Sequence, residues 1–102
     1  MQTNNLITAA TGTGAVSSVK NVQRVKTYQA NGTTSAGSGA ATIKVQGSNN
    51  DANWDDIGTI SLTLATTTSS DSFTSDDRYL YVRGNVTAIS GTNASVNLVM
   101  VS

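Results

Sequence analysis

The sequence predicts an all-β protein, folded as an antiparallel β-sandwich with a jelly-roll-like order of strands. Apolar and polar residues alternate in several segments, which is the spacing of a strand with one buried face. Charged residues make up 12% of the chain, about half of the roughly 25% found in soluble domains. Thr, Ser, Val, Asn and Gly replace them, and these residue types favour strands and turns. No stretch keeps helical spacing over three turns.

A chain of 102 residues has room for a single hydrophobic core, so we predict one sandwich domain over residues 15–102. Residues 1–14 contain Leu6 and Ile7 but no long alternation. This segment is predicted to form either an extended N-terminal arm or a short edge strand. As an arm, it would place Leu6 and Ile7 at an interface with a neighbouring subunit or a larger assembly.

The strand pattern occurs in five segments, which are residues 19–29, 41–47, 60–64, 79–88 and 94–100. In the second segment, Lys44 and Gln46 fall on the polar parity, away from the predicted core. A turn at 90–93 is predicted to join the last two segments into a hairpin. Two stretches rich in Ser and Thr, at 31–39 and 65–75, are predicted to be loops because they offer little apolar surface.

Composition removes most catalytic chemistry from consideration. The chain has no His, no Cys and no Glu, so it lacks an imidazole base, a thiolate nucleophile and the usual transition-metal ligands. Its Asp residues fall in predicted loops, where solvated carboxylates are poorly suited to glycosidase-type acid catalysis. We therefore expect a non-enzymatic protein with no catalytic residue and no cofactor.

Charge and hydropathy limit the partners. The formal net charge is zero, so no long-range field draws the protein to nucleic acid. No segment approaches the ~20 apolar residues of a membrane span, and the N-terminus lacks the pattern of a secretion signal. We therefore expect protein partners, with no nucleic acid and no membrane.

The sharpest acidic feature is the D-x-N-x-D spacing of Asp51, Asn53 and Asp55, which matches the first three ligand positions of a calcium loop. The match then fails, because the Gly and Glu expected at the sixth and twelfth positions are missing. The alternative is a turn closed by Asn and Asp side chains. Trp54, within this segment, is predicted to be a structural residue that covers the open end of the core.

Two further sets of side chains are predicted to form interfaces. Tyr79, Tyr81 and Arg83 share one parity of a predicted strand and offer large contact areas with polar tips. The alternatives for this set are cross-strand pairing on a solvent face or packing inside the second sheet. Arg24 and Lys26 share a face of another strand. They could meet an acidic protein surface, although exposed cations also serve solubility.

Two stretches of the chain together resemble a family of small phage virion proteins. In that family a strand ends in a VQGSND-like turn before a Trp, and a later YxYVR-N-VTAISGT segment closes a β-sandwich. The matching positions, in roughly the C-terminal half, are residues 45–49 (VQGSN), Trp54, 81–83 (YVR) and 86–92 (VTAISGT). The chain departs from the family at residues 50–52, where an Asp-Gly turn is usual, and at Gly84, where a β-branched residue is usual.

The resemblance to phage virion proteins implies a structural function at the capsid surface of a virion, after synthesis in the host cytoplasm. We expect a protein that decorates or cements the capsid through contacts with the major capsid protein or another virion protein. It would also self-associate, with a trimer favoured.

A weaker similarity points to another class of function. The Ser-Asn-x-x-x-x-Trp turn is also similar to one in discoidin-type sandwiches, many of which bind glycans or lipid headgroups. The alternative is therefore a carbohydrate-binding module of a phage tail or fibre. In that module Trp54, Tyr79 and Tyr81 would stack on sugar rings.

Overall fold

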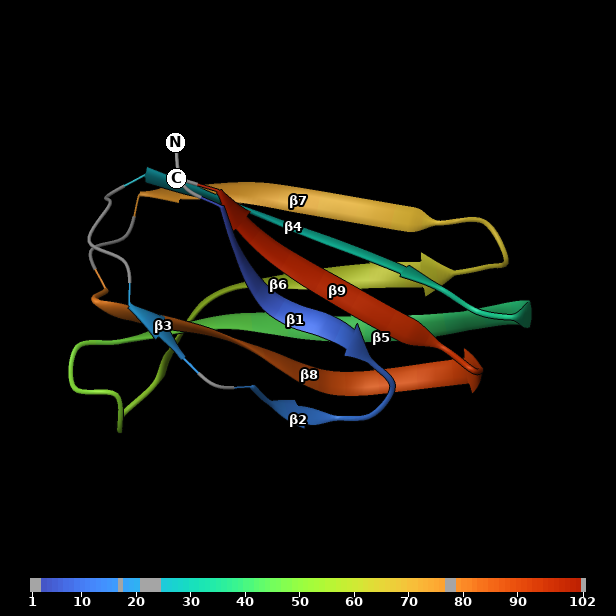
Figure 1. Ribbon diagram of the computed structural model, residues 1–102, viewed down its shortest axis with the longest axis horizontal. Helices are drawn as coiled ribbons and strands as arrows, with labels where there is room; N and C mark the ends of the chain where they lie inside the picture. The colour runs from blue at the N-terminus through green and yellow to red at the C-terminus, as the bar shows by residue number, and fades with distance from the viewer. Residues whose placement is uncertain (1–2, 17, 21–24, 77–78, 102) are drawn as a thin grey trace.

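The computed structural model describes residues 3–16, 18–20, 25–76 and 79–101, and its regular structure is entirely β (Figure 1). The described residues form nine strands. They are β1 (Thr3–Ala10), β2 (Gly14–Ala15), β3 (Val19–Lys20), β4 (Val25–Thr33), β5 (Ala36–Ser48), β6 (Asp55–Leu64), β7 (Ser69–Asp76), β8 (Tyr81–Thr92) and β9 (Ser95–Val101). Nowhere in these residues is there a helix that could cross a membrane.

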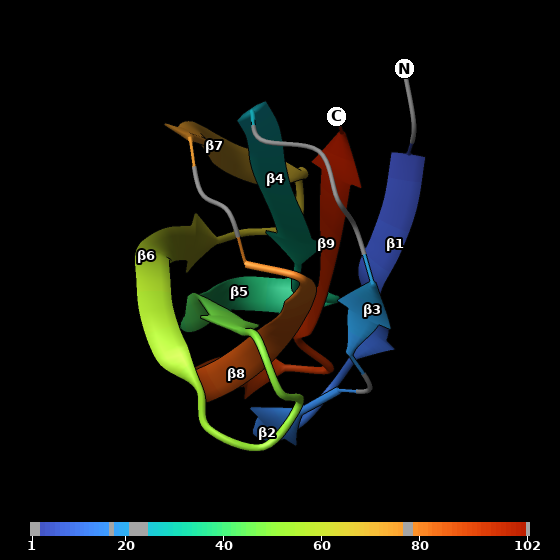
Figure 2. The same ribbon diagram turned by 90° about the vertical axis from the view of Figure 1, so that its left-hand side faces the viewer.

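The strands form two antiparallel sheets that pack face to face (Figure 2). Sheet A has four strands in the order β1-β9-β4-β7, and sheet B has five, in the order β2-β8-β5-β6 with β3 also paired to β8. β2 and β3 pair with different stretches of β8, so they act as two halves of one interrupted edge strand. The all-β class and the antiparallel sandwich are confirmed, and the strand order is compatible with the predicted jelly-roll-like arrangement.

The core lies between the two sheets and follows the alternation seen in the sequence. Leu98 and Met100 of sheet A and Ile43 of sheet B are fully buried, and burying a side chain of this size contributes roughly 1.5–3 kcal/mol. Tyr28, also fully buried, lies against Phe73 with ring centroids 5.2 Å apart. This contact ties β4, one of the two central strands of sheet A, to the edge strand β7.

Glycines on the inner face of sheet B let large side chains approach closely. A Cβ atom at Gly84 would lie 2.7 Å from Ile7 Cδ1 and 2.9 Å from Leu98 Cδ2, and one at Gly58 would lie 2.6 Å from Phe73 Cζ. Carbon atoms in a packed interior sit at about 3.5–4.0 Å. The departure at Gly84 from the phage family pattern therefore has a packing reason, because Ile7 fills the space above it.

Residues 3–10 belong to the sandwich and do not form an extended arm. β1 pairs antiparallel with β9 at the edge of sheet A. The register shifts between Asn5 and Ile7, and Leu6 and Ile7 are only 4% and 2% exposed. The prediction that these two residues contact a partner is corrected, since both are in the core. The bulge breaks the alternation that would have revealed their place.

Both stretches predicted to be loops are largely strands. β4 extends to Thr33 and β5 begins at Ala36, so two residues connect them. Residues 69–76 form β7, which pairs with β4 in continuous register. Backbone pairing to a neighbouring strand, with Phe73 packed on the core, supports β7 although most of its side chains are small and polar.

Candidate interaction surface on the outer face of sheet B

The strands β8, β5 and β6 lie side by side in sheet B (Figure 1), and their outer face carries a set of polar and charged side chains. The register places Gln46 of β5 opposite Arg83 of β8 on one side and opposite Asp56 of β6 on the other. The preceding residues Val45 and Val82 are fully buried. Because successive side chains in a strand point to opposite faces, Gln46 and Arg83 point away from the core.

Hydrogen bonds join these side chains into a row across the three strands. The Arg83 Nε donates to Gln46 Oε1 at 2.9 Å, and Gln46 Nε2 donates to Asp56 Oδ1 at 3.0 Å. Lys44 Nζ donates to Asp56 Oδ2 at 3.2 Å, in an ion pair whose side chains are 39% and 50% exposed. Exposed ion pairs contribute ~0.2–1 kcal/mol. The main effect of the row is therefore to hold its side chains in defined positions.

Trp54 extends this row at the Arg83 end. The Cζ atom of Arg83 lies 4.2 Å from the centroid of the Trp54 ring, which is a cation–π contact. Trp54 immediately precedes β6 and is half-buried. The prediction that it covers the open end of the core is corrected, because it stacks on the outer face. We call the following five residues the charged row: Lys44, Gln46, Trp54, Asp56 and Arg83.

The carboxyl group of Asp56 is the electrostatic centre of the charged row. Its pKa lies below the ordinary value of 3.8, first because of the hydrogen bond from Gln46 and next because of the hydrogen bond from Lys44. Desolvation acts in the opposite direction and the charge of Lys44 adds to the lowering. Asp56 is therefore ionised at neutral pH, which suits binding and does not suit proton donation.

Tyr79 packs against Gly47 near the end of β5. Its ring lies where a Cβ atom at Gly47 would project, and Gly47 is buried on the core-facing parity of β5. Its hydroxyl donates to Asp55 Oδ2 at 3.5 Å. Tyr79 thus packs over Gly47, and the glycine provides the space for its ring.

The predicted interface set of Tyr79, Tyr81 and Arg83 is therefore divided. β8 begins at Tyr81, and Tyr81 and Arg83 alternate with buried residues on the outer face. Tyr79 precedes the strand and packs inward over Gly47. The structure brings Arg83 together with Trp54, Gln46 and Asp56 instead. Sequence reasoning left Gln46 out of the site, although its polar parity was visible in the alternation of 41–47.

The turn between β5 and β6 is closed by an Asn side chain. Asn50 Oδ1 accepts hydrogen bonds from the backbone N–H groups of Ala52 and Asn53 at 3.0 and 2.9 Å. Asp51 Oδ1 accepts from the Ser18 hydroxyl at 2.6 Å, whereas Asp55 accepts from a tyrosine hydroxyl. The two carboxylates of the predicted calcium loop thus have different partners. The part of the chain that the structure describes holds no group of three or more acidic side chains suited to a metal, so the calcium prediction gains no support.

The other predicted basic contact is not on an exposed face. Lys26 is fully buried, because it shares the core-facing parity of β4 with Tyr28 and Ala30. The prediction that Lys26 meets an acidic partner on the surface is therefore corrected. Arg24, its predicted partner in that set, lies outside the described residues.

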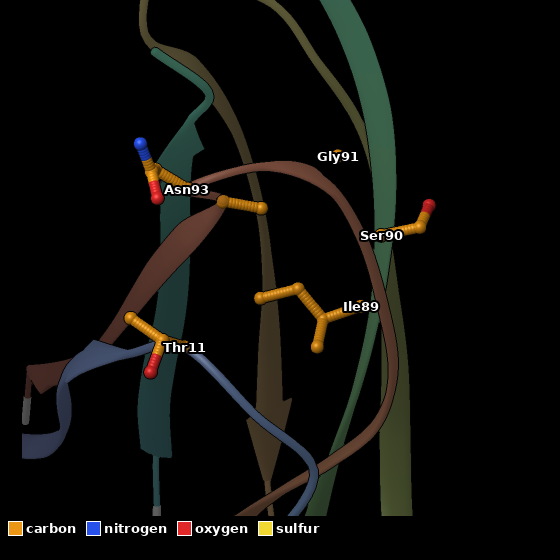
Figure 3. Close-up of a pocket in the computed structure, with 6 residues that line it drawn as sticks. Thr11, Ile89, Ser90, Gly91 and Asn93 are labelled. Atoms are coloured by element: carbon orange, nitrogen blue, oxygen red, sulfur yellow. The ribbon is translucent and has the colours of Figure 1, made fainter.

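A hollow of about 360 Å³ lies beside the β8–β9 hairpin. It is lined by Thr11, Ile89, Ser90, Gly91, Asn93 and Ala94. Ile89 points toward the side of the hollow where Thr11 and Asn93 lie, whereas Ser90 points away (Figure 3). Its side chains are uncharged hydroxyl, amide and aliphatic groups, which offer no nucleophile and base pair for catalysis. The charged row is the better candidate for a functional site.

Comparisons with known proteins bear on the fold. No known protein family and no curated protein matches the sequence. The structure is similar to the crystal structure of PBSX exported protein XepA, with a TM-score of 0.57 and 14% sequence identity. The similarity covers 97% of this chain and 36% of XepA, so this chain spans about a third of the XepA length. At this identity the likeness concerns the all-β fold, which the two proteins share.

Proposed function

We propose that this protein is a non-enzymatic structural component of a phage particle, and that it decorates the capsid by docking on a capsid protein through the charged row. The observation that carries the proposal is the prebuilt geometry of this row. Arg and Trp are the residue types that most often dominate protein interfaces. Here Arg83 holds Trp54 by stacking at 4.2 Å and is itself held by Gln46 at 2.9 Å.

Prior ordering of these side chains favours binding. Immobilising a flexible side chain at an interface costs roughly 0.5–1.5 kcal/mol, and the contacts among Arg83, Trp54 and Gln46 already restrain these side chains before binding. Lys44 and Asp56 pair at 3.2 Å, but Arg83 is a second cation, so the charged row as a whole has a net positive charge. A partner surface with hydrogen-bonding groups, a recess for Trp54 and an acidic side chain facing Arg83 fits this row.

The structural neighbour supports a phage-related role in a coarse sense. XepA is a phage-derived exported protein, and the resemblance of residues 45–49 and 86–92 to phage virion proteins points in the same direction. Neither observation specifies the capsid. That part of the proposal rests on the size of the chain and on the charged row.

Co-sedimentation with purified capsids tests the proposal. Capsids of the encoding phage, stripped of this protein, are mixed with the wild-type chain and with Trp54→Ala, Arg83→Ala and Ser61→Ala. Ser61 is exposed on β6 of the same sheet and is the matched control. We expect the first two variants to bind at least roughly 10-fold more weakly, as interface hot spots do, and the control to bind as wild type.

Two results would overturn the proposal: wild-type chain that does not bind stripped capsids, or equal binding by all the variants. A glycan array run with the same proteins addresses the other class of function. Glycan binding that disappears in Trp54→Ala, in a chain that ignores capsids, would favour the carbohydrate-binding module.

A further inference from the structure

The outer face of sheet A is almost free of charge. Its outward residues come from alternate positions of β7, β4, β9 and β1, which the register places in cross-strand rows. Three of these rows are Thr74–Thr27–Val101–Thr3, Ser72–Gln29–Val99–Asn5 and Ser70–Asn31–Asn97. Among the described residues of this face, Asp76 at the end of the edge strand β7 is the charged one. We call this surface the neutral face.

Polar side chains on the neutral face already bond to one another. Asn97 Nδ2 donates to Asn31 Oδ1 at 3.0 Å, and Asn97 Oδ1 accepts from the backbone N–H of Ala9 at 2.8 Å. The hydroxyl groups of Thr27 and Thr74 are 3.0 Å apart and share a hydrogen bond. Groups that are satisfied within the chain lose little when water is removed, so this face can be covered without a large desolvation penalty.

Apolar side chains interrupt the neutral face at its centre and at one corner. Val99 and Val101 lie on β9, one of the two central strands of the sheet. Val25 is 57% exposed and is the large apolar residue that the described part of the chain leaves most open to solvent. Val99 near the centre, with Val101 and Val25 toward one end, thus gives the neutral face an apolar component within a hydroxyl- and amide-rich surround.

We propose that the neutral face is a self-association surface, on which the same face of a second copy of this chain packs with twofold symmetry. A charged partner would have to strip water from its charges against a surface that offers no opposite charge. The same face of a second copy brings no such charge, apart from Asp76 at its edge. Side-chain amides both donate and accept hydrogen bonds, so Gln29 and Asn31 can pair with their own copies across a twofold axis.

The dimensions of the neutral face predict a weak dimer. Eight residues at ~3.4 Å and four strands at ~4.8 Å give a face of roughly 500 Å², or about 1,000 Å² for two copies. Stable complexes bury ~1,200–2,000 Å², and weaker ones fall below that range. Two sheets packed face to face keep their strands within about 30° of each other. We therefore expect reversible association in the micromolar range or weaker. This inference does not depend on capsid binding, because it concerns the opposite side of the molecule.

Sedimentation equilibrium tests the inference. The protein concentration is raised from roughly 1 µM to roughly 1 mM, which covers the expected dissociation constants. Over this range the wild-type mass should rise from 10.5 kDa toward twice that value. Gln29→Lys and Val99→Lys place two like charges near the twofold axis and should weaken association at least roughly 10-fold. Ser61→Lys adds the same charge to the exposed face of sheet B and should dimerise as wild type.

Gln29 is exposed, so its variant keeps the test valid even where Val99→Lys fails to fold, which far-UV circular dichroism reports. A wild-type chain that stays at 10.5 kDa up to the highest concentration overturns the inference. So does a dimer that Ser61→Lys disrupts while Gln29→Lys leaves it intact. Arg83→Ala separates this inference from the proposed function, because this variant should lose capsid binding in co-sedimentation and still dimerise in sedimentation equilibrium.

Discussion

The outer faces of the two sheets differ in the charged side chains that they carry. On sheet B, a cation stacks on an indole ring, and an amide links the cation to a carboxylate across three strands. On sheet A, hydroxyl and amide groups form short hydrogen bonds among themselves, with Val99 near the centre. Both faces belong to similar antiparallel sheets around one core, so the backbone does not cause the difference. The difference shows that the two outer faces of one small sandwich can carry different side-chain chemistry.

The largest expected effect comes from the packing that supports both faces. Gly84→Ala places a Cβ atom 2.7 Å from Ile7 Cδ1. Overpacking of this kind destabilises by roughly 1–3 kcal/mol, and each kcal/mol lowers the Tm of a domain this size by roughly 4–8 °C. Gly12→Ala is the matched control, because a Cβ atom there meets nothing within 4 Å. Thermal unfolding followed by circular dichroism compares them, and equal Tm values would contradict the described packing of Ile7.

The second prediction compares Tyr79, which packs over Gly47, with Trp54, which stacks on Arg83. Tyr79→Ala removes a ring packed over Gly47 and should destabilise by roughly 2 kcal/mol, less than the ~3–5 kcal/mol of a fully buried aromatic residue. Trp54→Ala removes a cation–π contact on the outer face and should cost only about 1 kcal/mol. Urea unfolding measures both. A larger loss of stability in Trp54→Ala than in Tyr79→Ala would mean that Trp54 packs on the core.

The third prediction measures the coupling inside the charged row. A double-mutant cycle of Arg83→Ala and Trp54→Ala should give a coupling of about 0.5–1 kcal/mol, the value for a cation–π pair at a surface. Arg83→Lys keeps the charge and loses the planar group, so it should retain only part of the coupling. No coupling between the two sites would mean that their contact does not order Trp54.

The smallest effect is electrostatic and belongs to sheet B alone. Asp56 has a lowered pKa, so its contribution to stability is fully present above the unfolded-state value near ~3.9 and is lost as pH falls through the lower folded-state value. Gln46→Ala removes the largest cause and should raise the pKa of Asp56 toward 3.8. Carbon-13 NMR of the carboxyl group measures it. Gln29→Ala, on the opposite sheet, should leave the titration of Asp56 as it is in wild type.

The sequence was most informative where strands alternate regularly. Within β5 and β9, the residues of apolar parity are the buried ones, because each strand has one face on the core. The same alternation put Lys44 and Gln46 on the polar parity. It gave no sign that Asp56, ten residues after Gln46, would share a hydrogen bond with it, since that contact depends on strand register and on a bulge between β5 and β6.

The alternation of apolar and polar residues did not predict the structure where a bulge or a neighbouring strand determines burial and pairing. The bulge in β1 buries both Leu6 and Ile7, and a polar stretch becomes β7 because β4 offers it a paired edge. Local composition cannot reveal either event.

The sequence by itself determined the all-β class, the inward parity of most strands and the set of chemical groups available, because these follow from composition and period. Only the tertiary structure decided which side chains meet. It placed Trp54 against Arg83 and Tyr79 over Gly47, buried Lys26, and brought Lys44, Asp56 and Arg83 together on the outer face of sheet B. The physical reason is that pairing between strands distant in the chain sets register, and register decides which polar groups become neighbours.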